Sequence, residues 1–338
     1  MNASPESAAC SASRGPLDFA SRFGLEQPIL NASMAGAAGG ALAAAVSSAG
    51  GLGMLGIGSG SKAGWLHEQA SLASAPGGAW GAGLMAWVLE ESMDPLKVLL
   101  EHRPGFICVS FGEPGPAAEL AHSAGALVGM QVGNAAELER ALGEDIDVVI
   151  CRGSEGGGHG RNEVTTLPLL QLALEKTDKP VIGAGGIATA RGIAAILGSG
   201  AQAVWVGTRF AAAKESLSHV RVKEAIGRAS IDDTLYTRAF DIAQEIPWPR
   251  HYGGRALRNG FSEQWTERIG ELEAAVEGDH GITDSMEDAR RNADLDTAPV
   301  YAGQSAGLSG TGESAASIMA DLAGFRAHLA AASGRWTA

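Results

Sequence analysis

One histidine of this sequence lies in a run of glycines. Residues 152–160 read Arg-Gly-Ser-Glu-Gly-Gly-Gly-His-Gly. Glycines on both sides give the backbone the freedom to place the His159 imidazole over a bound ligand. A neutral imidazole accepts a proton from carbon or oxygen near pH 7. The pattern therefore predicts His159 as a catalytic base, whereas Glu155 either orients the loop or is a solvated carboxylate.

Two glycine turns further along the chain predict a phosphate site. Residues 184–187 read Ala-Gly-Gly-Ile, and residues 206–210 read Val-Gly-Thr-Arg-Phe. Glycine lets backbone N–H groups approach phosphate oxygens without a Cβ in the way, and the start of a helix favours an anion. In (β/α)₈ enzymes the loops after strands seven and eight often bind phosphate. The plainer alternative is that both segments are tight turns only.

Eight short apolar runs must position these residues. Each run is too short for an ordinary helix, and nearly unbroken apolar character indicates a strand buried on both faces. Helical segments such as 41–49, 135–142 and 191–197 lie between them, and this alternation predicts an α/β protein with a (β/α)₈ TIM barrel. The eight predicted strands are 28–32, 51–55, 82–88, 106–111, 127–132, 148–152, 180–184 and 203–207.

The amino-acid composition of the chain changes after the last predicted strand. Residues 215–298 are richer in charge and polar helical stretches, which predicts an inserted helical cap. The barrel domain then comprises residues 17–214 and 299–338, with a final helix at 313–329. Residues 1–16 are rich in Ala and Ser without an apolar core, so we expect a disordered tail rather than a secretory signal.

The composition limits the possible partners. The net charge is −13 over 338 residues, and no basic run of five or more occurs, which argues against nucleic acid and against anionic membrane surfaces. No apolar run is long enough to span a bilayer. Three cysteines without C-x-x-C spacing indicate buried thiols in a reducing cytoplasm, and no metal site is expected. The sequence does not determine the oligomeric state, and a homo-oligomer is left open.

Residues 51–56 match the pattern G-x-G-x-x-G. A dinucleotide fingerprint needs a strand before the glycines and a helix that opens within them. Here a helical stretch precedes the glycines, and the segment itself has the character of a strand. We therefore expect these glycines to let the second barrel strand pack closely.

Taken together, these motifs resemble those of the nitronate monooxygenases, also called the 2-nitropropane dioxygenase family. The resemblance extends from about residue 17 to residue 329. It rests on residues 27–29 and 32–34, on Val-Ser-Phe-Gly at 109–112, on the His159 loop, on both glycine turns, and on Tyr-Ala-Gly-Gln at 301–304. The histidine loop combined with both turns is the specific part of the match.

The resemblance implies a (β/α)₈ barrel with a helical cap and noncovalent FMN. It implies that O₂ oxidises a small-molecule alkyl nitronate to a carbonyl compound and nitrite. His159 would be the base or would polarise the nitronate. The cofactor would be held by Ala32, Ser33 and Met34 along the flavin ring, by Gln131 through a hydrogen bond, and by Ala184, Gly185, Gly186, Gly207 and Thr208 around the phosphate. Gly153 is a further expected cofactor-binding residue.

The sequence also departs from the family pattern. Ser33 stands where proline is usual, Gly156 where alanine is usual, and Arg152 where glutamine is usual. Arg152 is either a cation near the flavin ring or a surface charge. The nearest alternative function is an FMN-dependent enoyl-acyl-carrier-protein reductase that uses NAD(P)H. A flavin protein without turnover and a flavin-free barrel enzyme for a phosphorylated substrate are further alternatives.

Overall fold

The computed structural model describes residues 17–336, and its centre is a ring of eight parallel strands. Along the sheet the order is β1-β9-β8-β6-β5-β4-β3-β2, and a parallel bridge between Leu30 and Leu52 brings the two ends together. The predicted TIM barrel is thus confirmed. The strands are β1 (Ile29–Asn31), β2 (Gly53–Gly56), β3 (Trp80–Met85), β4 (Phe106–Ser110), β5 (Leu127–Val132), β6 (Val148–Arg152), β8 (Val181–Ala184) and β9 (Ala203–Val206).

The side chain of Asn31 closes the seam between β1 and β2. Its Nδ2 donates to the carbonyl of Met54 at 2.8 Å, and its Oδ1 accepts from the N–H of Met54 at 2.8 Å. The indole Nε1 of Trp205 donates to the Asn31 carbonyl at 2.6 Å. A buried amide must have hydrogen-bond partners, and Asn31 is fully buried. Its hydrogen bonds therefore fix the register of β1 against β2, which are otherwise joined by the Leu30–Leu52 bridge.

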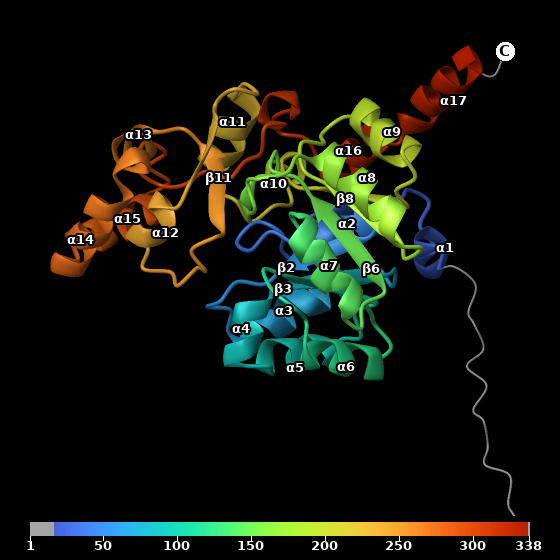
Figure 1. Cartoon of the computed structure of the whole chain (residues 1–338), viewed down its shortest axis with the longest axis horizontal. Coiled ribbons are helices and arrows are strands. Elements are labelled where there is room, and N and C mark those ends of the chain that lie inside the picture. The colour runs from blue at the N-terminus through green and yellow to red at the C-terminus, as the bar shows by residue number, and fades with distance from the viewer. Residues whose placement is uncertain (1–16, 337–338) are drawn as a thin grey trace, which may run out of the picture.

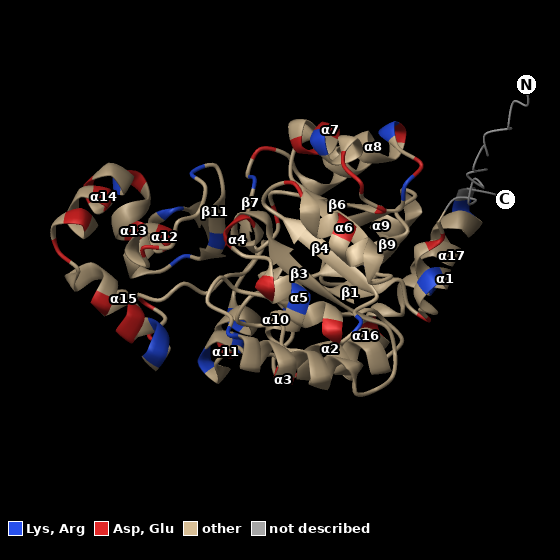
Figure 2. Cartoon of the chain, turned by 90° about the horizontal axis from the view of Figure 1, so that it is seen from below, with Lys and Arg blue, Asp and Glu red and all other residues tan. Residues whose placement is uncertain are grey.

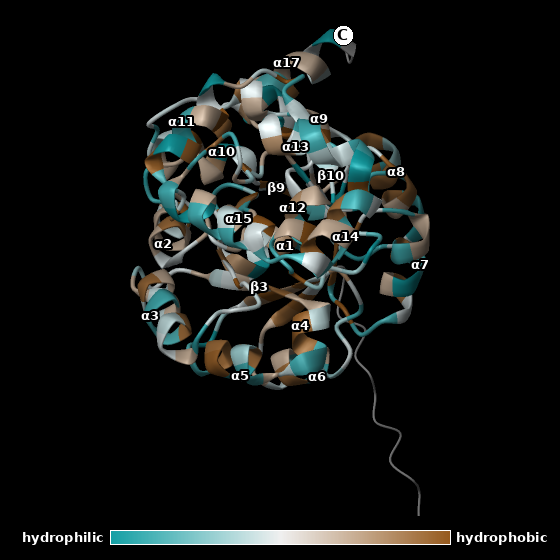
Figure 3. Cartoon of the chain, turned by 90° about the vertical axis from the view of Figure 1, so that its left-hand side faces the viewer, coloured by the Kyte–Doolittle hydropathy of each residue, from teal (hydrophilic) through white to brown (hydrophobic). Residues whose placement is uncertain are grey.

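Helices surround the strands on the outside of the barrel. Figure 3, seen from the side of the cap, shows them as a ring, and Figure 2 shows that their charged residues are spread over the outer surface. Most predicted strands differ from the observed ones by one or two residues at an end. The larger differences are that the third strand ends at Met85, where α4 (Ala86–Glu91) begins, and that the predicted last helix is split after Leu322. The outer helices are α2 (Gly40–Ser48), α3 (Ala63–Ser74), α5 (Asp94–Glu101), α6 (Pro116–Ser123), α7 (Ala135–Gly143), α8 (Thr166–Lys176), α9 (Ala190–Gly198), α16 (Ala315–Leu322) and α17 (Phe325–Trp336). The short helix α1 (Phe19–Phe23) lies instead at the amino ends of the strands, where Phe19 packs edge-on against Phe106 at the start of β4.

The glycines of β2 permit close packing in the barrel. A Cβ on Gly53 would lie 1.9 Å from the carbonyl oxygen of Ala43 in α2. A Cβ on Gly56 would lie 2.2 Å from the backbone carbon of Met34, in the loop after β1. Neither position has room for a side chain. The interpretation that these glycines serve packing is therefore confirmed.

We call residues 215–298 the cap, and its part at residues 239–292 forms a lobe beside the barrel (Figure 1). The cap contains the helices expected there, but it also contains two strands, β10 (Thr234–Thr237) and β11 (Gly253–Leu257). β11 pairs antiparallel with β10 on one side and with β7 (Gly158–Gly160) on the other. The glycine loop after β6 thus joins a three-stranded sheet with the cap. The cap helices are α11 (Val220–Arg228), α12 (Ala239–Ala243), α13 (Gly260–Trp265), α14 (Ile269–Gly278) and α15 (Gly281–Asn292).

The division of the chain into barrel and inserted cap at residues 215 and 298 stays a proposal, and the predicted tail at 1–16 lies outside the described residues. Among residues 17–336, no helix combines the length and apolar character needed to cross a membrane. Cys108 and Cys151 are buried in strands β4 and β6.

Candidate active site

The predicted cofactor residues lie at the carboxyl ends of the barrel strands. Ala32 and Met34 follow β1, and a Cβ on Gly207, after β9, would lie 3.6 Å from the Cβ of Ala32 and 3.7 Å from the Sδ of Met34. The N–H of Gly153, after β6, donates to the carbonyl of Ala184 at 3.0 Å. Segments distant in sequence therefore meet at one end of the barrel, as a shared binding site requires.

The turns after β8 and β9 present unused donors. Gly185 and Gly186 have φ angles of 103° and 71°, a left-handed backbone that favours glycine. No acceptor among residues 17–336 binds the backbone N–H groups of Gly186, Ile187 or Thr208. The Oγ of Thr208 accepts from the N–H of Gly303 at 2.9 Å, which leaves its hydroxyl hydrogen available. These donors fit a phosphate group.

Glu155 holds the start of the histidine loop in place. Its carboxylate accepts from the N–H of Thr166 at 2.9 Å and from the Thr166 hydroxyl at 3.0 Å. A Cβ on Gly153 would lie 2.2 Å from the same N–H. Of the two roles considered for Glu155, the structure favours orientation of the loop, and Gly153 is required by the close approach to Thr166.

Arg152 points into the histidine loop. Its buried Nη2 donates to the carbonyls of Gly156, Gly157 and Gly158 at 2.7, 3.1 and 3.0 Å. Burial lowers the pKa of the guanidinium to about 10, so it stays protonated at neutral pH. The possibility of a surface charge is wrong, because three carbonyls of one turn provide acceptors that hold the cation inside.

His159 lies on β7 and faces the cap. Its side chain is 10% exposed, and its Nε2 lies 2.7 Å from the Oδ1 of Asp241 in α12. The hydroxyl of Tyr301 donates to the same Oδ1 at 3.3 Å. Burial and the nearby charge of Asp241 raise the pKa of Tyr301 well above its ordinary value, so the phenol keeps its proton. His159, Asp241 and Tyr301 form a connected polar cluster.

Aromatic rings surround this cluster. Trp248 stacks on the His159 imidazole with centroids 3.7 Å apart and an interplanar angle of 6°. Trp87 and Phe111 meet Trp248 edge-on at 5.3 and 4.8 Å. Phe111 has a φ of 67°, a left-handed conformation that costs about 1–3 kcal/mol for a residue of this size. This strained conformation places the Phe111 ring against Trp248 and Tyr252 of the cap.

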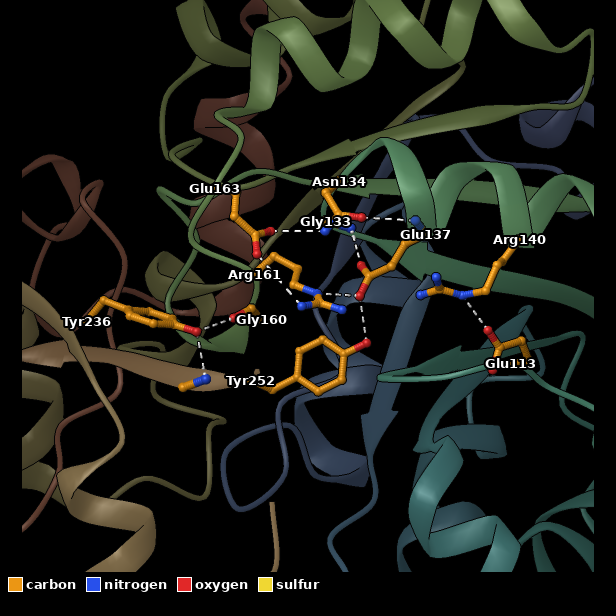
Figure 4. A network of polar contacts seen from close by, with 11 residues as sticks. Glu113, Gly133, Asn134, Glu137, Arg140, Gly160, Arg161, Glu163, Tyr236 and Tyr252 are labelled. Atoms are coloured by element: carbon orange, nitrogen blue, oxygen red, sulfur yellow. Dashed lines mark hydrogen bonds and ion pairs between the residues drawn. The ribbon is translucent and has the colours of Figure 1, made fainter. Parts of the chain in front are cut away.

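A second polar network ties the cap to the barrel (Figure 4). Glu137 in α7 accepts from Tyr252 at 2.7 Å, from the Nε of Arg161 at 2.7 Å and from the N–H of Gly133 at 2.7 Å. The guanidinium of Arg161 also lies 4.9 Å from the centre of the Tyr252 ring. The segment that carries Trp248 and Tyr252 is therefore anchored next to His159.

Sequence reasoning identified His159 and the glycine turns but missed their supporting residues. Gln131, on β5, is partly exposed, and its side chain binds no other residue in the described part of the chain. Asp241 was overlooked, although a carboxylate within the apolar run Ala-Phe-Asp-Ile-Ala is a signal for a buried pair. Residues 17–336 contain no group of three or more His, Cys, Asp or Glu side chains arranged to hold a metal ion.

The fold and this end of the barrel are those of a (β/α)₈ enzyme, and its unused backbone donors fit a phosphorylated cofactor. The family profile "Nitronate monooxygenase" matches residues 82–324, which is most of the chain. The chain belongs to this family of flavin-dependent oxidoreductases.

Individual proteins agree with that assignment. Nitronate monooxygenase npaC of Metarhizium robertsii is 29% identical over 314 residues, which cover 83% of this chain and 85% of that protein. FabK from Thermotoga maritima superposes with a TM-score of 0.80 at 32% identity, covering 94% of this chain and 98% of that one. Nitroalkane oxidase from Streptomyces ansochromogenes gives a TM-score of 0.78 at 25% identity, covering 94% and 99%.

Proposed function

We propose that this protein binds FMN and oxidises small alkyl nitronates with O₂ to a carbonyl compound and nitrite. The observation that carries the proposal is the link between the phosphate turns and the histidine. A Cβ on Gly157, in the loop before His159, would lie 2.4 Å from the N–H nitrogen of Gly303. That same N–H binds Thr208 in the phosphate turn. The proposed base and cofactor site are thus packed together.

The residues divide into three groups around FMN. Backbone N–H groups of Gly186, Ile187 and Thr208 would bind the phosphate. Ala32, Ser33 and Met34 would line the flavin ring through backbone atoms, and Gln131 has an amide free to bind it. The flavin, when bound, supplies the redox chemistry between the nitronate and O₂.

His159 handles the proton. With a neutral nitroalkane, its imidazole accepts the proton from the carbon next to the nitro group. With a nitronate that is already deprotonated, the imidazole binds and polarises the anion. Trp248 covers one face of the imidazole, and Phe111 packs against Trp248. This cover limits the access of water to the histidine, which strengthens these electrostatic interactions.

The likeness to FabK leaves the reductase alternative open. A reductase of that kind must admit a nicotinamide nucleotide and a long acyl arm. The stretch that matches G-x-G-x-x-G, residues 51–56, contains β2, and Trp248 covers one face of His159 at 3.7 Å. Both observations favour a compact substrate over an extended one.

The test is to identify which compounds reduce the bound flavin. We expect purified protein to be yellow, to release FMN and not FAD on denaturation, and to be reduced anaerobically by propyl-1-nitronate or propyl-2-nitronate. With O₂ it should release nitrite, while NADH and NADPH should reduce the flavin slowly or not at all. Fast reduction by either nicotinamide, without nitrite from any nitronate, would promote the reductase function. If the purified protein is colourless and FMN does not reconstitute it, both the nitronate-oxidising and the reductase functions are excluded.

A further inference from the structure

We propose that Asp241 is a positioning residue that fixes the tautomer of His159, so that Nδ1 is the proton acceptor. The catalytic consequence rests on the proposed function, whereas the tautomer itself does not. Asp241 comes from the cap, and His159 comes from the loop after β6, 82 positions earlier. The base is thus assembled from two parts of the chain.

The contacts assign the protons around Asp241. A carboxylate oxygen only accepts hydrogen bonds, so the Nε2 of His159, at 2.7 Å from Oδ1, must carry a hydrogen. Tyr301 supplies a second donor to the same oxygen at 3.3 Å. The Asp241 side chain is 6% exposed, so water competes weakly for it. In a neutral imidazole with hydrogen on Nε2, the lone pair is on Nδ1.

Packing prevents the ring from exchanging its two nitrogens. Trp248 lies parallel to the imidazole at 3.7 Å, and the Tyr301 ring lies 5.2 Å from it. A flip of the ring would break the hydrogen bond to Asp241 inside this aromatic packing. Nδ1 is therefore held in one orientation, as a general base requires.

This geometry determines where the proton goes when a neutral nitroalkane reacts. The proton on the carbon next to the nitro group moves to Nδ1, the C–H electron pair becomes the C=N bond, and the negative charge goes to the nitro oxygens. His159 becomes an imidazolium with hydrogens on both nitrogens. Asp241 stabilises that cation through Nε2–H and does not take its proton. Without Asp241, the imidazole would still be present but in a mixture of tautomers.

The tautomer can be measured directly. We expect the ¹⁵N chemical shifts of His159 in the flavin-loaded protein, assigned with His159→Asn, to show hydrogen on Nε2 and a lone pair on Nδ1. In Asp241→Asn the amide can donate to Nε2, so hydrogen should move to Nδ1. Hydrogen on Nδ1 in the unmodified protein would overturn the proposal, whether or not the Asp241 variants fold.

Activity supplies the second readout. Asp241→Asn should lower kcat for a neutral nitroalkane by about 10²–10⁴-fold and leave turnover of a preformed nitronate much less affected. Asp241→Glu should restore hydrogen on Nε2 and part of the loss. The matched control is Asp147→Asn, which removes the carboxylate from another pair, 2.8 Å from the Nε2 of His122, and should change neither readout.

The experiments distinguish failure of the Asp241 proposal from failure of the proposed function. Equal losses on both substrates with an unchanged tautomer would assign Asp241 a purely structural role and overturn the proposal. If the unmodified protein turned over neither substrate, the proposed function would fail, while the ¹⁵N shifts would still decide whether Asp241 sets the tautomer.

Discussion

Tyr252 of the cap donates a hydrogen bond of 2.7 Å to Glu137, a 3% exposed residue of the barrel helix α7. Burial and the adjacent Glu137 raise the pKa of Tyr252, so the phenol remains a donor throughout the working pH range. Four positions before Tyr252, Trp248 stacks on His159. The contact therefore fixes the aromatic cover of the histidine to the barrel.

Glu137→Gln tests this anchor. The amide cannot neutralise Arg161 while accepting from both Arg161 and Tyr252, so we expect the free energy of unfolding to fall by about 1–3 kcal/mol. Glu139→Gln, two positions along the same helix and 58% exposed, should change it by less than about 0.5 kcal/mol. Urea unfolding measures both. Equal effects of the two substitutions would show that the buried network around Glu137 does not stabilise the fold.

His159→Asn removes the proton acceptor and roughly keeps its size. We expect turnover of neutral nitroalkanes to fall by about 10²–10⁴-fold. Preformed nitronates are already deprotonated, so their turnover should fall less. Steady-state nitrite release with each substrate form measures the difference. Unchanged rates with both forms would remove His159 from the mechanism.

Gly207→Val tests the phosphate turn with little damage to the fold. A Cβ at Gly207 would meet Ala32 and Met34 only at ordinary distances of 3.6 and 3.7 Å, so the fold should tolerate it. The added side chain should nevertheless block a phosphate and lower the flavin content. Gly143→Val, in open space at the end of α7, is the control. Full flavin occupancy in a stable Gly207→Val protein would argue against this phosphate site.

Arg152→Met keeps an unbranched, mostly aliphatic side chain but removes the guanidinium donors. The carbonyls of residues 156–158 would lose their shared partner, and we expect a loss of about 1–3 kcal/mol in unfolding free energy. Activity with neutral nitroalkanes should fall as well, because this turn leads directly to His159. Arg228→Met, at a 76% exposed arginine, is the control. Stability equal to that of the control would mean that Arg152 does not support the loop.

Cys108 and Cys151 should be unreactive in the folded protein. Burial raises the pKa of each thiol to about 12, so the thiolate fraction at pH 8 is on the order of 10⁻⁴. In a Cys10→Ser variant, a thiol reagent at pH 8 should therefore react slowly before denaturation and with both cysteines after it. Rapid reaction in the native state would show that β4 or β6 opens readily.

Much of the barrel follows from local sequence. The predicted strands at 127–132 and 148–152 coincide with β5 and β6, because unbroken apolar runs between turns have few other ways to be buried. The predicted strand at 82–88 ends three residues early, since Ala86 begins α4. Apolar residues suit either a buried strand or a buried helix, so their pattern did not locate that boundary.

The strand β7 could not be predicted, since its three residues are Gly, His and Gly. Such a segment has low intrinsic strand propensity, and it is a strand only because β11 offers it hydrogen-bond partners. The expectation of a helical cap also missed the other two strands of this sheet, because β10 and β11 are short and lie among polar residues.

By itself, the sequence determined the alternation of strands and helices, the two glycine turns and the histidine between glycines. These features depend on residue type, local spacing and the conformational freedom of glycine. The tertiary structure alone decided that Asp241 meets His159 across 82 positions, that Glu137 binds Tyr252 across 115, and that Arg152 turns into its own loop. Such pairings depend on where the chain returns after closing the barrel, and no local pattern encodes that path.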